Sequence, residues 1–156
     1  MTQHTPTRPT AAFVGASWAA LLAGCLAFVV GLWNAHLALS EKGYYLTILL
    51  YGLFAAVSLQ KSVRDRMEGI PVSGIYFALA WISVGASLVL LGVGLWNATL
   101  ASSEKGFYAM SFTLAVFAAV AVQKNVRDLA AAGPEADPLP EPYPPLDGPS
   151  RLAPPR

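Results

Sequence analysis

Residues 31–65 read GLWNAHLALSEKGYYLTILLYGLFAAVSLQKSVRD, and residues 94–128 repeat them as GLWNATLASSEKGFYAMSFTLAVFAAVAVQKNVRD. Of the 35 aligned positions 21 are identical, and they fall into three blocks: GLWNA, SEKG with an aromatic pair, and FAAV leading into QKxVRD. Copies of a repeat form equivalent structural units, so both stretches are expected to share one structure. Each holds an SEKG turn between apolar segments, which predicts two helical hairpins in tandem.

The composition is typical of a membrane protein. Hydrophobic residues make up 55% of the 156 residues and charged residues 12%, whereas soluble domains have about 45–50% and 25%. Four segments, 13–33, 43–59, 74–96 and 106–122, contain no Asp, Glu, Lys, Arg or His. A helix needs roughly 17–25 apolar residues to cross a bilayer core. The predicted fold class is therefore an all-α membrane protein with four transmembrane helices, arranged as two tandem, parallel-repeat helical hairpins.

Four parts of the chain are expected to differ in character. Residues 1–9 form a polar N-terminal arm, 10–69 the first two-helix membrane repeat, and 70–132 the second. Residues 133–156 include nine prolines and are expected to form an extended or disordered tail. A signal peptide is the alternative for the first apolar segment, but its 21 residues exceed the length of a signal h-region, about 7–15 residues.

Polar and small residues mark the expected helix ends. Thr10, Ser40 and Ser73 each precede an apolar segment and are candidate N-caps for the first three helices. Gly69 followed by Pro71 is typical of a helix C-terminus, because glycine adopts the left-handed conformation and proline cannot continue the helix.

The end of the first helix is less well defined. It is expected to run through Trp33 and, by pattern, on to Leu39, with Asn34 as the awkward polar residue. Asn34 is either an interfacial or C-capping side chain or the donor of a hydrogen bond between the hairpins, worth about 0.6–2 kcal/mol.

Small residues could let the helices approach closely, since no hydrophobic effect drives association inside a membrane. They recur four positions apart as Ala20 with Gly24, Gly52 with Ala56, Ser83 with Ser87, and Ala115 with Ala119. The lone Cys25 is expected to be another small packing residue.

The residues kept at both turns form the candidate functional site. An exposed Glu–Lys pair contributes only about 0–1 kcal/mol, so packing explains poorly why SEKG keeps both charges twice. We hypothesise a rim that contacts a partner or lipid headgroups; the rival interpretation is a recent duplication with aromatic anchors, Tyr44 and Tyr45 in the first copy, at headgroup level. The rim comprises Trp33, Asn34, Glu41 and Lys42 with their counterparts Trp96, Asn97, Glu104 and Lys105.

No constellation typical of catalysis is present. His4 and His36 are far apart in sequence, Cys25 has no visible partner, and neither metal-ligand spacing nor a phosphate-binding loop occurs. We therefore predict no catalytic residue, cofactor or metal. A net charge of +1 gives no electrostatic case for nucleic acid.

The predicted function is that of a small non-catalytic integral membrane protein. It would act through helix–helix or rim contacts with the lipid bilayer, with itself as a homo-oligomer, or with another membrane protein. A small transporter or channel subunit is the alternative, although the four segments lack the ionisable residues that such proteins keep in the membrane.

The positive-inside rule predicts the orientation. Both termini and the middle loop are expected in the cytoplasm and both SEKG turns on the opposite side of the membrane. The cationic residues on the cytoplasmic side would be Arg8, Lys61, Arg64, Arg66, Lys124 and Arg127, against Lys42 and Lys105 on the other.

The blocks GLWNA, SEKGYY, QKSVRD, EGIP, GLWNATL, SEKGFY and QKNVRD, in this order and spacing, resemble the YiaA/YiaB family of small bacterial inner-membrane proteins. The resemblance covers residues 13–128, nearly everything except the two tails. It implies a two-helix membrane unit, here in two copies, in a bacterial cytoplasmic membrane. It implies no activity and no binding residues.

Overall fold

The computed structural model describes residues 8–132, which form four helices. These are α1 (Ala11–Asn34), α2 (Leu39–Met67), α3 (Gly74–Asn97) and α4 (Ser102–Ala132). Each is long and apolar enough to cross a membrane, and the expected fold class is confirmed. The expectations for residues 1–7 of the arm and for the tail, 133–156, fall outside the described chain.

The predicted caps at two helix starts and one helix end are confirmed. The Oγ1 of Thr10 accepts a hydrogen bond from the N–H of Phe13 at 3.3 Å, and the Oγ of Ser73 accepts one from the N–H of Tyr76 at 3.2 Å. Gly69 ends α2 with a φ of +75°, a conformation that costs glycine little. Side-chain oxygens thus satisfy an orphaned amide in the first turns of α1 and α3.

Two predicted boundaries are wrong. Ser40 is not an N-cap, because α2 already begins at Leu39 and Ser40 lies in its first turn. The first helix does not reach Leu39 but ends at Asn34, since Ala35 adopts an extended conformation with ψ of 144°. The chain needs residues 35–38 to reverse direction, and an intact helix there would leave none.

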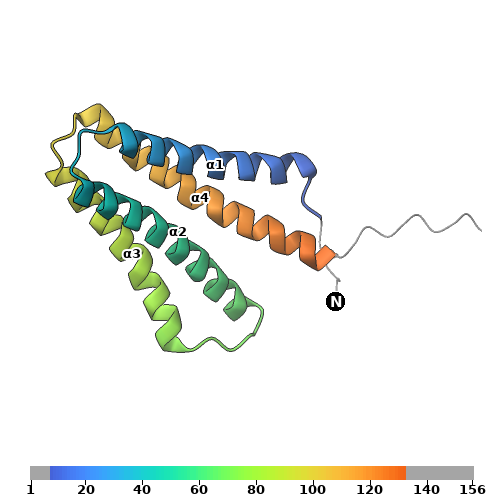
Figure 1. Ribbon diagram of the computed structural model, residues 1–156. Coiled ribbons are helices and arrows are strands. Elements are labelled where there is room, and N and C mark those ends of the chain that lie inside the picture. The colour runs from blue at the N-terminus through green and yellow to red at the C-terminus, as the bar shows by residue number, and fades with distance from the viewer. Residues whose placement is uncertain (1–7, 133–156) are drawn as a thin grey trace, which may run out of the picture.

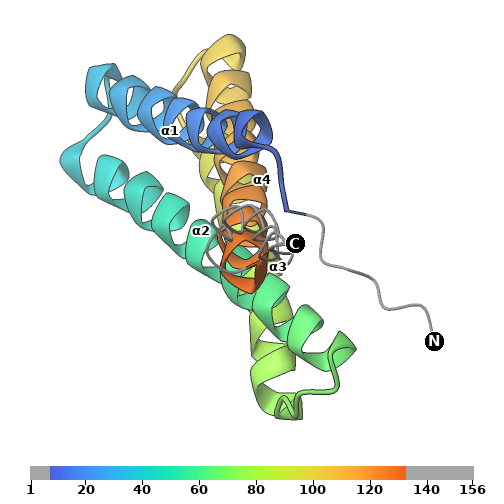
Figure 2. The same ribbon diagram turned by 90° about the vertical axis from the view of Figure 1, so that its right-hand side faces the viewer.

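The helices pack between the two sequence copies rather than within each copy. α1 packs along α4, α2 packs along α3, and α2 also contacts α4, whereas α1 and α2 meet sparsely. Figure 2 shows α1 and α2 diverging from the turn that joins them. The hairpin is therefore the repeating unit of the sequence, but its packing partner is the other hairpin.

Both copies have the same orientation in the bundle. The loops 35–38 and 98–101 lie together at one end, on the left of Figure 1, which we call the turn end. The α2–α3 loop and the C-terminus of α4 lie at the opposite end, which we call the charged end. A pseudo-two-fold axis along the bundle therefore relates the copies, as the even number of spans in each copy predicts.

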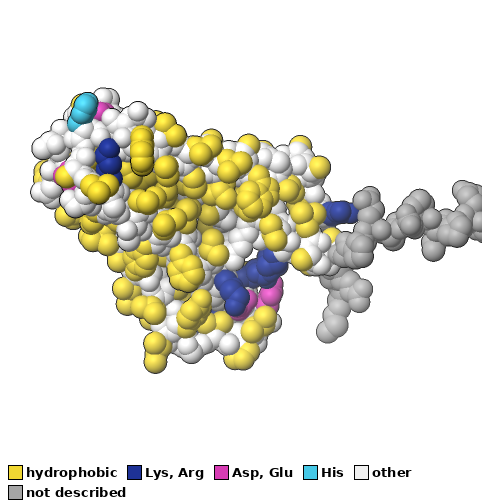
Figure 3. Space-filling model, in the orientation of Figure 1, with side chains coloured by type: hydrophobic (Ala, Val, Ile, Leu, Met, Phe, Trp, Pro, Cys, Tyr) yellow, Lys and Arg dark blue, Asp and Glu magenta, His cyan; other side chains and the backbone are white. Residues whose placement is uncertain are grey.

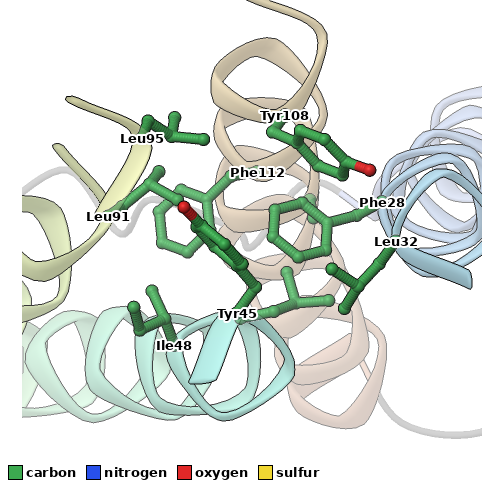
Figure 4. Packing of buried hydrophobic residues seen from close by; sticks show 10 residues of the cluster. Phe28, Leu32, Tyr45, Ile48, Leu91, Leu95, Tyr108 and Phe112 are labelled. Atoms are coloured by element: carbon green, nitrogen blue, oxygen red, sulfur yellow. The ribbon is translucent and has the colours of Figure 1, made fainter. Parts of the chain in front are cut away.

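An aromatic stack marks this axis. Tyr45 of α2 and Tyr108 of α4 are counterparts in the repeat, and their rings stack with centroids 6.2 Å apart and planes 16° from parallel. Phe28 of α1 meets the Tyr108 ring edge-on at 5.4 Å, with Phe112 beside it (Figure 4). Such arrangements contribute about 0.5–1.5 kcal/mol beyond the area they bury. The core is thus built from both copies.

Glycine permits the closest helix approaches. A Cβ on Gly24 of α1 would lie 2.7 Å from the backbone nitrogen of Ala115 in α4, and a Cβ on Gly52 of α2 would collide with the Phe112 ring. Gly52 is the counterpart of Ala115, and the counterpart of Gly24 is Ser87. We call α2 and α4 the inner helices and α1 and α3 the outer helices. The α1–α4 crossing therefore has its glycine on the outer helix, and the α2–α3 crossing, where the Cβ position of Gly52 lies 3.5 Å from the Ser87 Oγ, has its glycine on the inner helix.

Ion pairs join the inner helices at the charged end. Arg64 of α2 lies 3.6 Å from Asp128 of α4, and Arg127 of α4 lies 2.8 Å from Glu68 just after α2. Arg64 also pairs with Glu68 at 2.7 Å. These contacts give QKxVRD a role between the copies that the sequence alone did not reveal. Figure 3 shows charged side chains at both ends and a mostly hydrophobic surface between them.

The Glu68 carboxylate is the shared acceptor of this network. Its hydrogen bond from Arg64, together with the charge of Arg127, lowers the pKa of Glu68 below its ordinary value. A carboxyl whose pKa is lower in the folded state stabilises the fold above the pKa of the unfolded chain, about 4.3 for Glu. That contribution is lost as pH falls through the lower folded pKa.

We expect Gly24→Ala to destabilise the bundle by about 1–3 kcal/mol, because the added methyl group forces α1 away from the α4 backbone. Gly15→Ala on the same helix is the matched control, since nothing lies within 4 Å of its Cβ position. Thermal unfolding in detergent, followed by circular dichroism, measures both. Equal unfolding temperatures for the two variants would contradict the close crossing.

We expect Glu68→Gln to lower the unfolding temperature slightly at pH 7 and to have little effect near pH 3. The parent should therefore lose more stability than the variant as pH falls below about 4.3. Salt at about 1 M should narrow the difference at pH 7, because it screens exposed charges. Parallel pH profiles for the two proteins would mean that the network contributes nothing to stability.

Candidate functional site

The predicted SEKG turn is wrong, because SEKG lies at the start of α2 and of α4 and the chain reverses in the loops before it, at 35–38 and 98–101. The glutamate of each SEKG segment caps the start of its own helix. The Oε2 of Glu41 accepts a hydrogen bond from the N–H of Ala38 at 2.8 Å, and the Oε2 of Glu104 accepts one from the N–H of Ala101, also at 2.8 Å. This is the glutamate half of a capping box, in which a side chain in the first turn satisfies the backbone just before the helix. Its charge also suits the positive end of the helix dipole.

The lysine of each turn reaches back to the preceding helix. The Nζ of Lys42 donates to the backbone oxygen of Trp33 at 2.8 Å, and the Nζ of Lys105 donates to that of Trp96 at 3.3 Å. A cation at a helix C-terminus satisfies a free carbonyl and complements the dipole. Each Glu–Lys pair thus fastens the end of one helix and the start of the next, which gives the retained charges a structural role that the sequence did not reveal.

The asparagines of the rim bond back to their own helices, whose C-caps are Ala35 and Ala98. The Nδ2 of Asn34 donates to the backbone oxygen of Val30 at 2.7 Å, and the Nδ2 of Asn97 donates to that of Val93 at 2.8 Å. Of the two interpretations offered for Asn34, the structure favours the local one, with a side chain bonded inside its own helix, and among the described residues it shows no hydrogen bond from the Asn34 Nδ2 to the other hairpin.

The tryptophans project from the turn end. Trp33 is 80% exposed and Trp96 is 86% exposed. Large indole rings left so open are typical of the interface between a membrane and water, where an apolar ring with one polar N–H is favoured.

The aromatic pair of each copy packs on a glycine of the other copy. A Cβ on Gly94 would lie 2.7 Å from the Tyr44 ring, and one on Gly31 would lie 2.8 Å from the Phe107 ring. Tyr45 is buried in the core at 3% exposure, so its expected role as an anchor among lipid headgroups is wrong. The glycine of GLWNA is therefore a seat for an aromatic ring, a role that only the three-dimensional arrangement reveals.

Two equivalent pockets open at the turn end. Each lies between the start of an inner helix and the end of an outer helix from the other copy, and every lining residue of one is the repeat counterpart of a lining residue in the other. The first, about 290 Å³, is lined by Ser40, Glu41, Tyr44, Tyr45, Gly94, Asn97 and Ala98. The second, about 340 Å³, is lined by Gly31, Asn34, Ala35, Ser103, Glu104, Phe107 and Tyr108.

The pockets divide the predicted rim between them. Glu41 shares the first pocket with Asn97, and Asn34 shares the second with Glu104. The structure thus brings each glutamate beside the asparagine of the other copy. The two lysines and the two tryptophans of the rim line neither pocket.

The lining chemistry favours a hydrogen-bond donor with positive charge. Glutamate is the only charged residue in either lining, and no lysine or arginine is available there for an anion. One oxygen of Glu41 is used by the Ala38 N–H, and a carboxylate has further acceptor capacity. Within residues 8–132 no three His, Cys, Asp or Glu side chains are grouped so that they could hold a metal ion.

Several buried polar side chains lie in the half of the bundle nearer the charged end. Asn125 is fully buried, and its Nδ2 donates to the Oγ of Ser17 at 3.0 Å, which ties α4 to α1. The side-chain oxygens of Gln60, Gln123 and Asn125 are buried and accept no hydrogen bond from the described chain. A buried polar atom of this kind costs about 1–3 kcal/mol, so packing does not explain why both copies keep this glutamine.

Comparison with known proteins agrees with the repeat. The yiaA/B two helix domain matches residues 13–65 and again residues 76–128. Inner membrane protein YiaA of Escherichia coli is 52% identical over 124 residues, which cover 80% of this chain and 86% of that protein. Uncharacterized membrane protein YubF of Bacillus subtilis is 39% identical over 62 residues, or 39% of this chain and 71% of that protein.

Inner membrane protein YiaB of Escherichia coli is 29% identical over 94 residues, covering 60% of this chain and 80% of that protein. No solved structure matches the chain. Two matches to one domain, together with four apolar helices, establish the relationship. The chain belongs to the YiaA/B family, with the two-helix domain in two copies, and is a multi-pass inner-membrane protein.

Proposed function

We propose that this chain is a non-catalytic membrane protein that acts through its turn end, where the twin pockets bind phospholipid headgroups bearing an ammonium group. The observation that carries the proposal is the pair of equivalent pockets, each with one glutamate and one asparagine from opposite copies. The two linings differ only in one aromatic residue, Tyr44 against Phe107, although the copies differ widely elsewhere.

The ligand class follows from the charge and position of the pockets. A carboxylate without a neighbouring cation in the lining attracts an ammonium group and repels a free phosphate. Tyr44 and Phe107 add aromatic rings to the walls, and such rings attract cations. A headgroup amine on a lipid satisfies both features.

A lipid is favoured over a soluble amine because of what surrounds each pocket. The exposed rings of Trp33 and Trp96 suit the headgroup layer. On the face seen in Figure 3 the surface between the two ends is mostly hydrophobic, so the acyl chains of a bound lipid would lie against the bundle. Capture of a partner protein through the same carboxylates is the alternative, and identification of the molecules that co-purify distinguishes it from lipid binding.

The proposal includes an orientation, with both termini in the cytoplasm and the turn end in the periplasm. The positive-inside rule supports it, because within residues 8–132 six cationic residues lie before α1 or toward the ends of α2 and α4, against Lys42 and Lys105 at the turn end. Reporter fusions at residue 42 and after residue 130 measure this directly. We expect a periplasmic signal at residue 42 and a cytoplasmic signal after residue 130; the opposite pattern would refute the orientation.

We expect the double variant Glu41→Gln with Glu104→Gln to lose bound lipid without losing stability. Glutamine keeps an oxygen that can accept the Ala38 and Ala101 N–H groups, as capping boxes allow, but it removes the charge. The measurement is mass spectrometry of phospholipids that co-purify in mild detergent. The parent should retain phospholipids with an ammonium headgroup in preference to anionic ones, and the double variant should lose that preference.

The alanine pair, Glu41→Ala with Glu104→Ala, is the matched control for capping. It removes both the charge and the cap, so it should lose the lipid preference and also lower stability by about 0.5–2 kcal/mol per turn. Equal lipid retention by the parent and the glutamine pair would refute the proposal. Loss of a co-purifying protein in place of lipid would assign the pockets to a protein partner.

A further inference from the structure

The two helical hairpins of the chain, α1–α2 and α3–α4, are called units below. They depend on each other for their buried surface. α1 finds its main partner in α4, and α3 finds its main partner in α2, so both long interfaces join different units. Within the first unit α1 and α2 touch only sparsely. A unit separated from its neighbour would therefore expose most of the surface that the bundle buries, including both rings of the Tyr45–Tyr108 stack.

The contacts between units are reciprocal, as in a two-fold dimer. Gly31 of the first unit receives Phe107 and Tyr108 of the second, and Gly94 of the second receives the equivalent tyrosines of the first. The crossings are reciprocal too, with Gly24 against Ala115 and Gly52 near Ser87. In a symmetric dimer the same patch of each subunit contacts its partner in this way.

One loop connects the units, and it contributes little to the packing. Residues 68–73 connect α2 to α3 and include Gly69 at the end of α2 and the N-cap Ser73 of α3. Both helix ends are completed by short-range hydrogen bonds. Ile70 donates to the backbone oxygen of Asp65 at 2.8 Å on one side. On the other side, the Oγ of Ser73 accepts from Tyr76 at 3.2 Å. A break between Pro71 and Val72 would disturb neither cap.

The relative from Bacillus subtilis matches over 62 residues, close to the 63-residue spacing between Gly31 and Gly94. That stretch covers 71% of that protein. A stretch about as long as one unit therefore makes up most of that protein.

We infer that this chain is a tethered dimer of two-helix units, in which the surface that one unit presents to the other fits a separate unit of the same kind. The loop at residues 68–73 raises the effective concentration of the partner, and it supplies Glu68, which pairs with Arg127 of the other unit, to the interface. Because each turn-end pocket takes residues from both units, the pockets exist only in the paired state.

The test uses the full chain with a protease site inserted between Pro71 and Val72 and a different affinity tag at each end. After cleavage in detergent, both fragments should be retained together on either tag. The unfolding temperature should be independent of protein concentration before cleavage and should fall on dilution after it, since cleavage makes a bimolecular equilibrium of an intramolecular one. An excess of cleaved, untagged chain should exchange units with the tagged one.

A pair of matched variants examines the interface itself. In the cleaved protein, Gly24→Leu should release the fragments, because the side chain would meet the α4 backbone, whereas Gly15→Leu on the same helix should not. The cleaved parent decides the inference even where Gly24→Leu fails to fold. Separation of the parent fragments on the first column, whether as folded units or as aggregates, would overturn it. So would an unfolding temperature that stays independent of concentration after cleavage.

Discussion

The packing of α2 and α4 around the stacked rings of Tyr45 and Tyr108 is the contact on which the other interfaces depend. In a membrane the apolar faces of helices gain little by leaving lipid, so association relies on close packing and on polar contacts. The stack supplies the first, and the ion pairs of Arg64 and Arg127 at the other end supply the second. With the inner helices fixed, α1 and α3 each have one long surface to cover.

The turns require a separate explanation, because they carry the residues that the two copies share most strictly. Glu41 and Lys42 bond to the backbone on the two sides of a four-residue loop, so substitution of either residue would leave a backbone group at one helix end without its partner. Capping thus accounts for the charges without any ligand. Capping does not explain why Glu41 and Asn97 meet in a pocket, since the Asn97 side chain bonds to Val93 of its own helix without help from Glu41. The pairing of Glu41 with Asn97 is therefore the feature that the proposed ligand binding would explain.

The sequence predicted four spans, the parallel orientation of the two copies and the Thr10, Ser73 and Gly69 caps, because apolar length, repeat parity and local capping are properties of short segments. It did not predict that α1 would pack on α4, since the identity of a neighbouring helix depends on pairs such as Gly24 and Ala115, which lie far apart in the chain. For the same reason the rim residues were identified individually, but their division into two mixed pockets was not. The buried position of Tyr45 was missed because an aromatic residue after a turn has the same sequence signal as a membrane anchor.

Differences between the copies show how the tether can be used. Ser17 and Asn125 are joined by a hydrogen bond in the α1–α4 interface, whereas the equivalent positions in the α2–α3 interface are Ala80 and Ser62. Glu68, the shared acceptor of the charged end, has Ala131 as its counterpart. In a dimer of identical subunits, the position of Ser17 and Ala80 would hold the same residue in both interfaces. In a fused pair each interface can have its own residue there. Asymmetry has accumulated at the charged end while the pockets at the turn end have stayed equivalent, which is the pattern expected if the turn end is the end where both units do the same work.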